Sequence, residues 1–330
     1  MFRSEEEFVG WLRSRTPRRA RGLRLGVGDD AAVIERSRGD DLVLKTDMFI
    51  EGVHFRRDLH PPRSIGHRAL ARSLSDVAAM GGTPRFALIS LAVSKRLGDA
   101  WIKQVYAGIL ALAAHFQVAV VGGDTAVVPG PTYMDVIVVG EVHRGHAVLR
   151  SGARPGDQIY VSGALGLSAL GLHLLRSKKR RPTHHANAGQ ALRVHLYPQP
   201  RCTLGAYLAD RRLASALIDV SDGLSTDLDH LCQASGVGAT ILQERLPAPH
   251  LPSNRLIRSE SPLRLALHGG EDYELLFTVP PRKVARIPRS FRGLAIHHIG
   301  EIRRAHHILL KRPDGTHLRL RAKGYDHFRK

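Results

Sequence analysis

A series of aspartates at the ends of short apolar runs, several of them beside glycine, constrains this sequence more than any other feature. The series spans both halves of the 330 residues and consists of Asp29, Asp30, Asp47, Asp76, Asp124, Asp219 and Asp222. Carboxylates that arrive at the ends of strands can converge on one cleft. A single Gly-Asp step is also an ordinary turn, because Gly accepts positive φ and Asp bonds nearby backbone amides. Repetition along the chain favours a shared site over coincidence.

Clustered carboxylates indicate a site for magnesium. This hard cation prefers oxygen ligands, retains several waters and is usually shared between one or two carboxylates and the phosphates of a substrate. Several carboxylates imply more than one ion, and such ions bridge phosphate oxygens and neutralise charge as a phosphoryl group moves. The residues therefore predict a site that binds several Mg²⁺ ions together with the phosphates of a substrate.

The common nucleotide-binding motifs are absent from the sequence. It contains no Gly-Lys-Ser/Thr of a P-loop and no protein-kinase catalytic loop, and the glycines at 163 and 166 lack the dinucleotide-binding spacing. Metal ions and backbone amides must therefore hold any nucleotide. The segment 163–168 follows an expected strand and opens an expected helix, where free amides can meet phosphate oxygens.

Apolar periodicity predicts helices and strands in both halves. The clearest helix spans 99–116, where apolar residues recur at three- and four-residue steps. A capping box at Ser4 and Glu7 opens a first helix, and Pro61-Pro62 starts another. Strands are expected at 31–34, 42–44, 86–93, 118–121, 136–142, 159–162, 216–220, 239–242, 273–279 and 294–299. This mixture predicts an α+β or α/β class, between which periodicity does not decide.

The length and one turn-rich stretch predict two domains. A chain of 330 residues exceeds what a single hydrophobic core usually supports. The stretch 151–157 combines glycine, proline and aspartate, and the strand and helix patterns restart after it. We therefore expect one domain at 1–149 and a second at 150–330.

The formal charge of +19 invites comparison with nucleic-acid-binding proteins, because Lys and Arg neutralise phosphates. The basic residues are scattered over the whole length, and no recognition motif accompanies them. Aromatic residues, which stack on bases, make up only 5% of the chain. A solvated surface explains the charge better, so we do not expect nucleic acid as a partner.

The sequence carries no sign of a membrane or of an oxidising compartment. No apolar run approaches the roughly 20 residues that a membrane span needs, and the segment 5–7 is acidic where a targeting peptide would be basic. The two cysteines, Cys202 and Cys232, exclude a disulfide framework and a four-thiolate zinc site. We expect a cytoplasmic protein.

Eight segments resemble, in order, the motifs of the thiamine-monophosphate kinase family and cover nearly the whole chain. They are Gly26–Ala31, Lys45–Met48 with Glu51–Phe55, Ser73–Gly81, Gly122–Thr125, Arg150–Ala153, Ile218–Leu224, Gly269–Glu274 and Gly324–Phe328. The resemblance implies an α+β, two-domain PurM-like fold of the aminoimidazole-ribonucleotide synthetase superfamily. In that fold the N-terminal domains of a homodimer pair into a β-barrel, and the C-terminal domain is α/β.

The resemblance also implies a reaction and roles for individual residues. ATP would phosphorylate thiamine monophosphate directly and in line, giving thiamine diphosphate without a dedicated acid or base. The magnesium positions are Asp30, Thr46, Asp47, Asp76, Asp124, Asp219 and Asp222. The ATP positions are Tyr106, Gly123, Asp124, Arg150 and Ser221. The thiamine-phosphate positions are His54 and Glu271, while Tyr325 is either a further contact or a core aromatic.

Two positions depart from the family's pattern. Lys45 stands where relatives often carry Ser or Thr beside the metal. An ammonium group cannot coordinate magnesium, so either one ion is lost or a backbone carbonyl takes over. Ala322 stands where some members place Trp against the substrate, so that contact is missing here.

Two alternative functions remain open. One is another ATP-using synthetase of the same superfamily, although selenophosphate synthetases usually carry a reactive Cys near the N-terminus and the first Cys here is Cys202. The other is a basic nucleic-acid-binding protein on a degenerate kinase fold, which predicts salt-dependent binding without ATP turnover.

Overall fold

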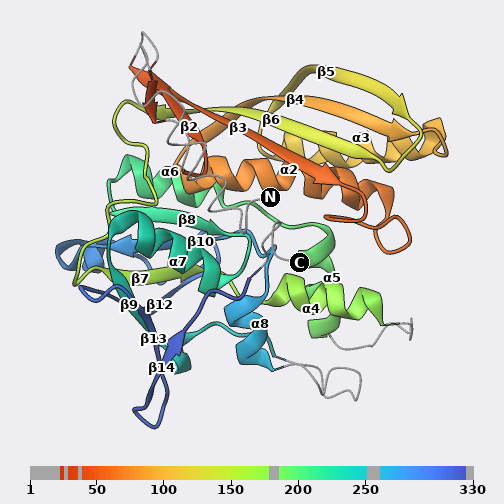
Figure 1. Cartoon of the computed structure of the whole chain (residues 1–330). Helices are drawn as coiled ribbons and strands as arrows, with labels where there is room; N and C mark the ends of the chain where they lie inside the picture. Colours follow the sequence, from red (N-terminus) through yellow and green to blue (C-terminus); the bar gives the residue numbers. More distant parts are fainter. Residues whose placement is uncertain (1–22, 26–28, 36–38, 178–185, 251–260, 325–330) are drawn as a thin grey trace, which may run out of the picture.

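Two β-sheets with a long helix between them organise the chain (Figure 1). The computed structural model describes all residues except 1–22, 26–28, 36–38, 178–185, 251–260 and 325–330. The helix expected at Ser4 therefore lies outside the described residues.

The N-terminal sheet has six strands in the order β1-β2-β3-β6-β4-β5. They are β1 (Leu23–Leu25), β2 (Ala32–Glu35), β3 (Asp40–Ile50), β4 (Thr83–Ser94), β5 (Ala119–Val128) and β6 (Tyr133–His143). Two helices, α2 (Pro62–Ala79) and α3 (Asp99–His115), cover one face of this sheet (Figure 1). Along β6, buried side chains alternate with half-buried ones, as a strand with one covered face requires.

The C-terminal sheet has eight strands in the order β14-β13-β9-β12-β7-β10-β8, with β11 paired to β12. The strands are β7 (Gln158–Ser162), β8 (Ala216–Val220), β9 (Gly238–Leu242), β10 (Glu274–Val279), β11 (Ser290–Phe291), β12 (Leu294–Arg303), β13 (Ile308–Lys311) and β14 (His317–Leu320). The helices of this half are α4 (Leu167–Arg176), α5 (Ala186–Leu196), α6 (Cys202–Asp210), α7 (Leu224–Ser235) and α8 (Pro262–His268). Strands β8 and β10 are buried along their whole length.

Strand directions decide the fold class. The pairs β4–β5 and β9–β13 are parallel, and the other strand pairs of the described residues are antiparallel. The chain is therefore α+β. An α/β C-terminal domain was expected, but only one pair there is parallel. Parallel neighbours need a crossover connection, and most neighbours in this sheet run in opposite directions, so α+β describes it better.

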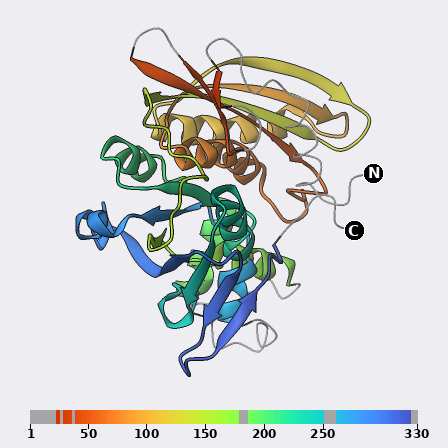
Figure 2. The ribbon, with the colours of Figure 1, turned by 60° about the vertical axis from the view of Figure 1, so that its left-hand side comes forward.

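Helix α2 is the element on which both halves pack. Nearly all of its residues from Ser64 onward are buried, including the charged Arg68 at 1% exposure. It contacts β3 and β6 on one side and α6, β8 and β10 on the other, and Figure 2 shows it between the sheets from a second direction. One apolar core runs across α2 to Phe277 of the C-terminal sheet, and a second lies against α7.

Several expected elements lie where the patterns placed them. The helix expected at 99–116 is α3, and the strand expected at 86–93 lies within β4. Strand β3 is longer than the expected 42–44, because polar residues at 45–47 continue the strand while interrupting its apolar pattern. The domain boundary near residue 150 stays a prediction. Among the described helices, none is both long and apolar enough for a membrane crossing.

Two glycines let α2 and α3 approach closely. A Cβ added to Gly66 would lie 1.9 Å from the carbonyl oxygen of Val105, and one added to Gly108 would lie 1.9 Å from that of Arg63. Both contacts are with backbone atoms, which cannot swing aside. The helix crossing therefore admits only glycine at these two positions.

We expect Gly108→Ala to destabilise the protein by about 1–3 kcal/mol, the range typical of an overpacked core. The matched control is Gly189→Ala on α5, where no atom lies within 4 Å of an added Cβ and alanine is the better helix former by about 1 kcal/mol. Urea unfolding measures both effects. A Gly108→Ala protein as stable as the wild type would contradict the close helix contact.

A buried histidine pair joins the two halves beside α2. The Nε2 atoms of His60 and His195 lie 3.0 Å apart, so one ring donates a hydrogen bond and the other accepts it. His195 Nδ1 lies 3.0 Å from Ser168 Oγ. Burial, with the charge of Arg68 second, lowers the pKa of His60 to about 4 and that of His195 to about 3. The pair is therefore neutral at pH 7.

This pair predicts a loss of stability in mild acid. An unfolded histidine titrates near pH 6.5, whereas these two resist protonation in the folded protein down to about pH 4 and about pH 3. Below pH 6.5 the unfolded chain binds more protons, so the free energy of unfolding falls by up to about 1.4 kcal/mol per unit of pKa difference. Urea unfolding between pH 7 and pH 4 measures this slope. His195→Asn should flatten it, and an unchanged slope would contradict the assignment.

Candidate functional site

Three aspartates that are far apart in the sequence meet in one cluster. Asp30 precedes β2, Asp76 lies in the last turn of α2, and Asp219 lies on β8. One carboxylate oxygen from each lies within 4.8 Å of those from the other two, and all three residues are buried. We call these three residues the carboxylate cluster. The turn that leads into the N-terminal sheet, the central helix and the C-terminal sheet each contribute one member.

The hydrogen bonds of the carboxylate cluster leave a buried oxygen of Asp30 for a cation. Ser75 Oγ donates to Asp219 Oδ2 at 2.6 Å, and Arg150 Nη2 donates to Asp30 Oδ1 at 2.6 Å. Asp30 Oδ2 is buried and has no hydrogen-bond partner among the described residues. An unpaired buried carboxylate oxygen is costly, and a hard divalent cation would satisfy it. The donor set therefore fits magnesium.

Crowding of these carboxylates disfavours their ionised forms. Burial, followed by the charge of Asp30, raises the pKa of Asp219 to about 7. Burial also raises the pKa of Asp76 well above its usual range, although Lys45 acts in the opposite direction. Positive charge nearby restores the ionised form of such groups, and a bound divalent cation supplies that charge.

Two ion pairs cross between β3 and α2 beside the carboxylate cluster. Lys45 Nζ lies 2.8 Å from Asp76 Oδ2. Arg72 donates from Nε to Asp47 Oδ2 at 3.1 Å and from Nη2 to Asp47 Oδ1 at 3.2 Å. Burial opposes ionisation of Asp47, but Arg72 and Lys45 outweigh it and lower its pKa. Asp47 therefore lies beside the cluster, paired with a cation.

Three further residues predicted for ATP or metal also lie beside the carboxylate cluster. Ser221 Oγ donates to Asp219 Oδ1 at 3.4 Å. Asp222 follows in the same turn after β8, and its charge contributes to the raised pKa of Asp219. Arg150 is the third, through its bond to Asp30.

Other predicted residues lie elsewhere in the chain. The hydroxyl of Thr46 points to the face of the sheet opposite its neighbour Asp47 and donates to Asp135 Oδ1 at 2.7 Å. Gly123 and the exposed Asp124 lie on β5, which β6 and β4 separate from β3. Tyr106 is half-buried on α3, against the apolar core. Neither the Thr46 hydroxyl nor the β5 pair joins the carboxylate cluster of a single chain.

The residues predicted for thiamine phosphate lie at the two ends of a chain of contacts. The rings of His54 and Phe49 stack with centroids 5.7 Å apart, and the guanidinium of Arg68 lies 5.4 Å from the Phe49 centroid. Arg68 Nη2 then pairs with Glu271 Oε1. Burial opposes ionisation of Glu271, but Arg68 outweighs it and lowers the pKa to about 2. Tyr325 lies outside the described residues.

Sequence reasoning missed Arg68 and Arg72, which hold Glu271 and Asp47. The two arginines are four residues apart on α2, and both guanidinium groups lie over the Phe49 ring, at 5.4 Å and 5.6 Å from its centroid. Their basic charge was attributed to a solvated surface. The helical spacing of Arg68, Arg72 and Asp76 among apolar neighbours was the signal that could have placed them on one buried face.

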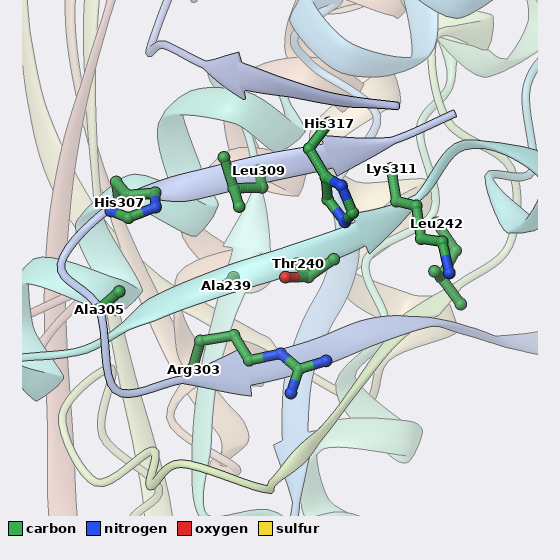
Figure 3. Close-up of a pocket in the computed structure, with 9 residues that line it drawn as sticks. All are labelled: Ala239, Thr240, Leu242, Arg303, Ala305, His307, Leu309, Lys311 and His317. Atoms are coloured by element: carbon green, nitrogen blue, oxygen red, sulfur yellow. The ribbon is translucent and has the colours of Figure 1, made fainter. Parts of the chain in front are cut away.

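A cavity of about 400 Å³ lies elsewhere, over strands β9, β12 and β13 of the C-terminal sheet. Figure 3 shows basic side chains at its rim, among them Arg303, Lys311 and His317, around a floor that includes Thr240 and Leu309. None of the predicted site residues lines it. Three of the residues predicted for magnesium lie instead in the carboxylate cluster.

Comparison with known proteins places both halves in one family. The sequence matches AIR synthase related protein, N-terminal domain, at residues 28–142, and AIR synthase related protein, C-terminal domain, at residues 154–311. These two domains make up the two-domain PurM-like fold.

Relatives and a solved structure narrow the family further. The thiamine-monophosphate kinase of Bacillus subtilis (strain 168) is 35% identical over 96% of this chain and 98% of its own length. That of Escherichia coli (strain K12) is 38% identical over 93% of this chain and 92% of its own. The structure of AaThiL complexed with AMPPCP and TMP matches with a TM-score of 0.82 at 32% identity, over 98% of this chain and 97% of that chain. The chain therefore belongs to the thiamine-monophosphate kinase family.

Proposed function

We propose that this protein transfers the γ-phosphoryl group of ATP to thiamine monophosphate, producing ADP and thiamine diphosphate. The observation that carries the proposal is the carboxylate cluster, with its buried and unpaired Asp30 Oδ2. Support comes from relatives named thiamine-monophosphate kinase and from the similarity to AaThiL, whose structure holds AMPPCP and TMP.

The reaction needs positioning and charge neutralisation more than it needs proton transfer. A phosphate oxygen of thiamine monophosphate forms a bond to the γ-phosphorus of ATP, and the bond from that phosphorus to the β–γ bridging oxygen breaks, so that ADP leaves. The attacking oxygen is already ionised at neutral pH, so no general base is required. Holding both phosphates in line can then supply much of the acceleration.

The aspartates around the cluster would hold magnesium. Asp30, Asp76 and Asp219 would be the ligands, with Asp47 and Asp222 beside them. Bound magnesium neutralises phosphate charge and links the phosphates to the protein. Asp124 and the backbone of Thr46 are the remaining metal positions that we propose.

Basic and acidic side chains would orient the two substrates. Arg150 has a planar guanidinium suited to phosphate oxygens. Its buried Nε lies 3.5 Å from Asp29 Oδ1 and makes no hydrogen bond within the described residues, so we place ATP phosphates there, beside Ser221. Glu271 stays ionised because of Arg68, and we place it, with His54, at the cationic thiamine end. An ionised carboxylate stabilises a thiazolium ring electrostatically.

We further propose that two copies pair through the N-terminal sheet and complete each other's sites. Met48 and Phe86, on the face away from α2, are 54% and 47% exposed, and Val121 on β5 is 57% exposed. Exposed apolar side chains grouped on one sheet are typical of an interface. Asp124 and Gly123 lie on that sheet's edge strand, away from the carboxylate cluster of their own chain, so a partner copy is the simplest source of both. Tyr106 would contact the adenine there.

The function is tested by incubating the purified protein with magnesium, ATP and thiamine monophosphate and measuring thiamine diphosphate. We expect product from the wild type, and Asp219→Asn should lower the rate by at least about 100-fold. Mutation of a residue that only supports a metal ligand typically lowers activity by about 10- to 100-fold, and loss of a ligand itself should cost more. Asp314→Asn, the same change in an exposed turn, is the control and should leave the rate unchanged. Absence of thiamine diphosphate with the folded wild type, or turnover of aminoimidazole precursors instead, would remove the proposed substrate.

Shared sites are tested by mixing two inactive variants. Asp124→Asn and Asp219→Asn should each be inactive alone. If each site takes Asp219 from one copy and Asp124 from the other, mixed dimers contain one intact site, and random pairing restores about a quarter of the wild-type rate. A mixture that stays inactive, although sedimentation shows that subunits exchange, would contradict the sharing of sites.

A further inference from the structure

We infer that Lys45 and Arg72 supply, from the protein itself, the positive charge that one divalent cation would otherwise bring to this site. This inference rests on one part of the proposed function: the site binds divalent cations. It is carried by the contacts of four residues on two facing elements, Lys45 and Asp47 on β3 and Arg72 and Asp76 on α2.

The two elements present these residues to each other by their regular periods. Side chains two apart on a strand share a face, and side chains four apart on a helix share a face. Lys45 and Asp47 therefore point together toward α2, where Arg72 and Asp76 stand one turn apart. On each element the cation comes before the carboxylate in the sequence, and the contacts pair Lys45 with Asp76 and Asp47 with Arg72.

The pairing occupies carboxylate oxygens that a metal ion would use. Both oxygens of Asp47 accept hydrogen bonds from Arg72, at 3.1 Å and 3.2 Å. Lys45 Nζ lies 2.8 Å from Asp76 Oδ2. An ammonium or guanidinium group has no lone pair for a metal, so Lys45 and Arg72 act as counter-ions and not as ligands. Two unit charges equal the charge of one divalent cation.

Contacts outside the site hold Arg72 in place. Its guanidinium lies 5.6 Å from the centroid of the buried Phe49 ring, a favourable position for a cation over an aromatic face. Lys45 is held by the strand pairing of β3 with β6, where it lies opposite Val138. The two cations are therefore part of the fold, whether or not a ligand is bound.

The remaining unpaired oxygen indicates where a cation is still needed. Asp30 Oδ2 is buried and has no hydrogen-bond partner in the described part of the chain, and it belongs to the carboxylate cluster with Asp76 and Asp219. The site would thus bind a divalent cation at the carboxylate cluster and would bind none beside Asp47. A nucleotide phosphate entering there would face the Lys45 ammonium, which has two further donors.

The experiment counts Mn²⁺ ions bound per chain in the presence of AMPPCP, using the electron paramagnetic resonance signal of free Mn²⁺. The double variant Lys45→Met, Arg72→Met keeps the length of both side chains and removes both charges. We expect it to bind one more Mn²⁺ than the wild type. The charge-preserving double variant Lys45→Arg, Arg72→Lys and the exposed control Arg85→Met, which lies in a salt bridge with Glu141, should keep the wild-type count.

An unchanged or lower Mn²⁺ count in the folded double variant would overturn the inference. Thermal unfolding verifies folding. If the double variant does not fold, the single variants decide in its place, because removing one positive charge from the site should tighten Mn²⁺ binding by about tenfold or more, and equal affinity would contradict the inference. An increased count without turnover of thiamine monophosphate by the wild type would remove the proposed function and leave this inference standing.

Discussion

Burying several carboxylates together is the constraint on which the rest of this structure depends. An isolated buried charge costs several kcal/mol, and like charges beside it add to that cost. The protein offsets the cost with three cations: Arg150 pairs with Asp30 and Asp29, Lys45 with Asp76, and Arg72 with Asp47. These residues come from the turn before β2, from β3 and α2, and from the segment that leads into the C-terminal half. Asp219 of the C-terminal sheet completes the carboxylate cluster, so the site forms only when both halves pack around α2.

Helix α2 links this electrostatic requirement to the fold. One side of it packs on the N-terminal sheet and the other on β8 and β10, and this double burial brings Asp76 to Asp219. Its close contact with α3 through Gly66 fixes its position under the sheet. The same helix carries Arg68, which keeps Glu271 ionised at the proposed thiamine end. One buried helix thus fixes where the proposed metal-binding residues lie relative to the proposed substrate-binding residues.

The sequence predicted the convergence of distant aspartates, and the structure brings Asp30, Asp76 and Asp219 together. Their roles as metal ligands stay predictions. The sequence marked them because each lies at one end of an apolar run. The roles of Arg68 and Arg72 were out of reach of that reasoning, since burial of a charged helix face depends on what packs against it. In a chain with 49 basic residues, two more arginines on a helix look like surface.

The sequence could predict on which face of the sheet a strand residue lies. It could not predict which part of another chain packs against an edge strand. Residues 45–47 continue β3, so the alternation of side chains along a strand places Thr46 on the other face of the sheet from Lys45 and Asp47. The Thr46 hydroxyl donates a hydrogen bond to Asp135 on that face. Asp124 matches a motif in sequence, yet β6 and β4 stand between its strand and β3. A single sequence cannot reveal which residues a second copy would supply.

The central claim is that three carboxylates from separate parts of the chain form one divalent-cation site. Anomalous X-ray scattering from crystals grown with Mn²⁺ and AMPPCP tests it most directly. The account predicts an anomalous peak among the carboxylate oxygens of Asp30, Asp76 and Asp219. Bound AMPPCP with Mn²⁺ at other positions, and no peak among these three, would contradict it.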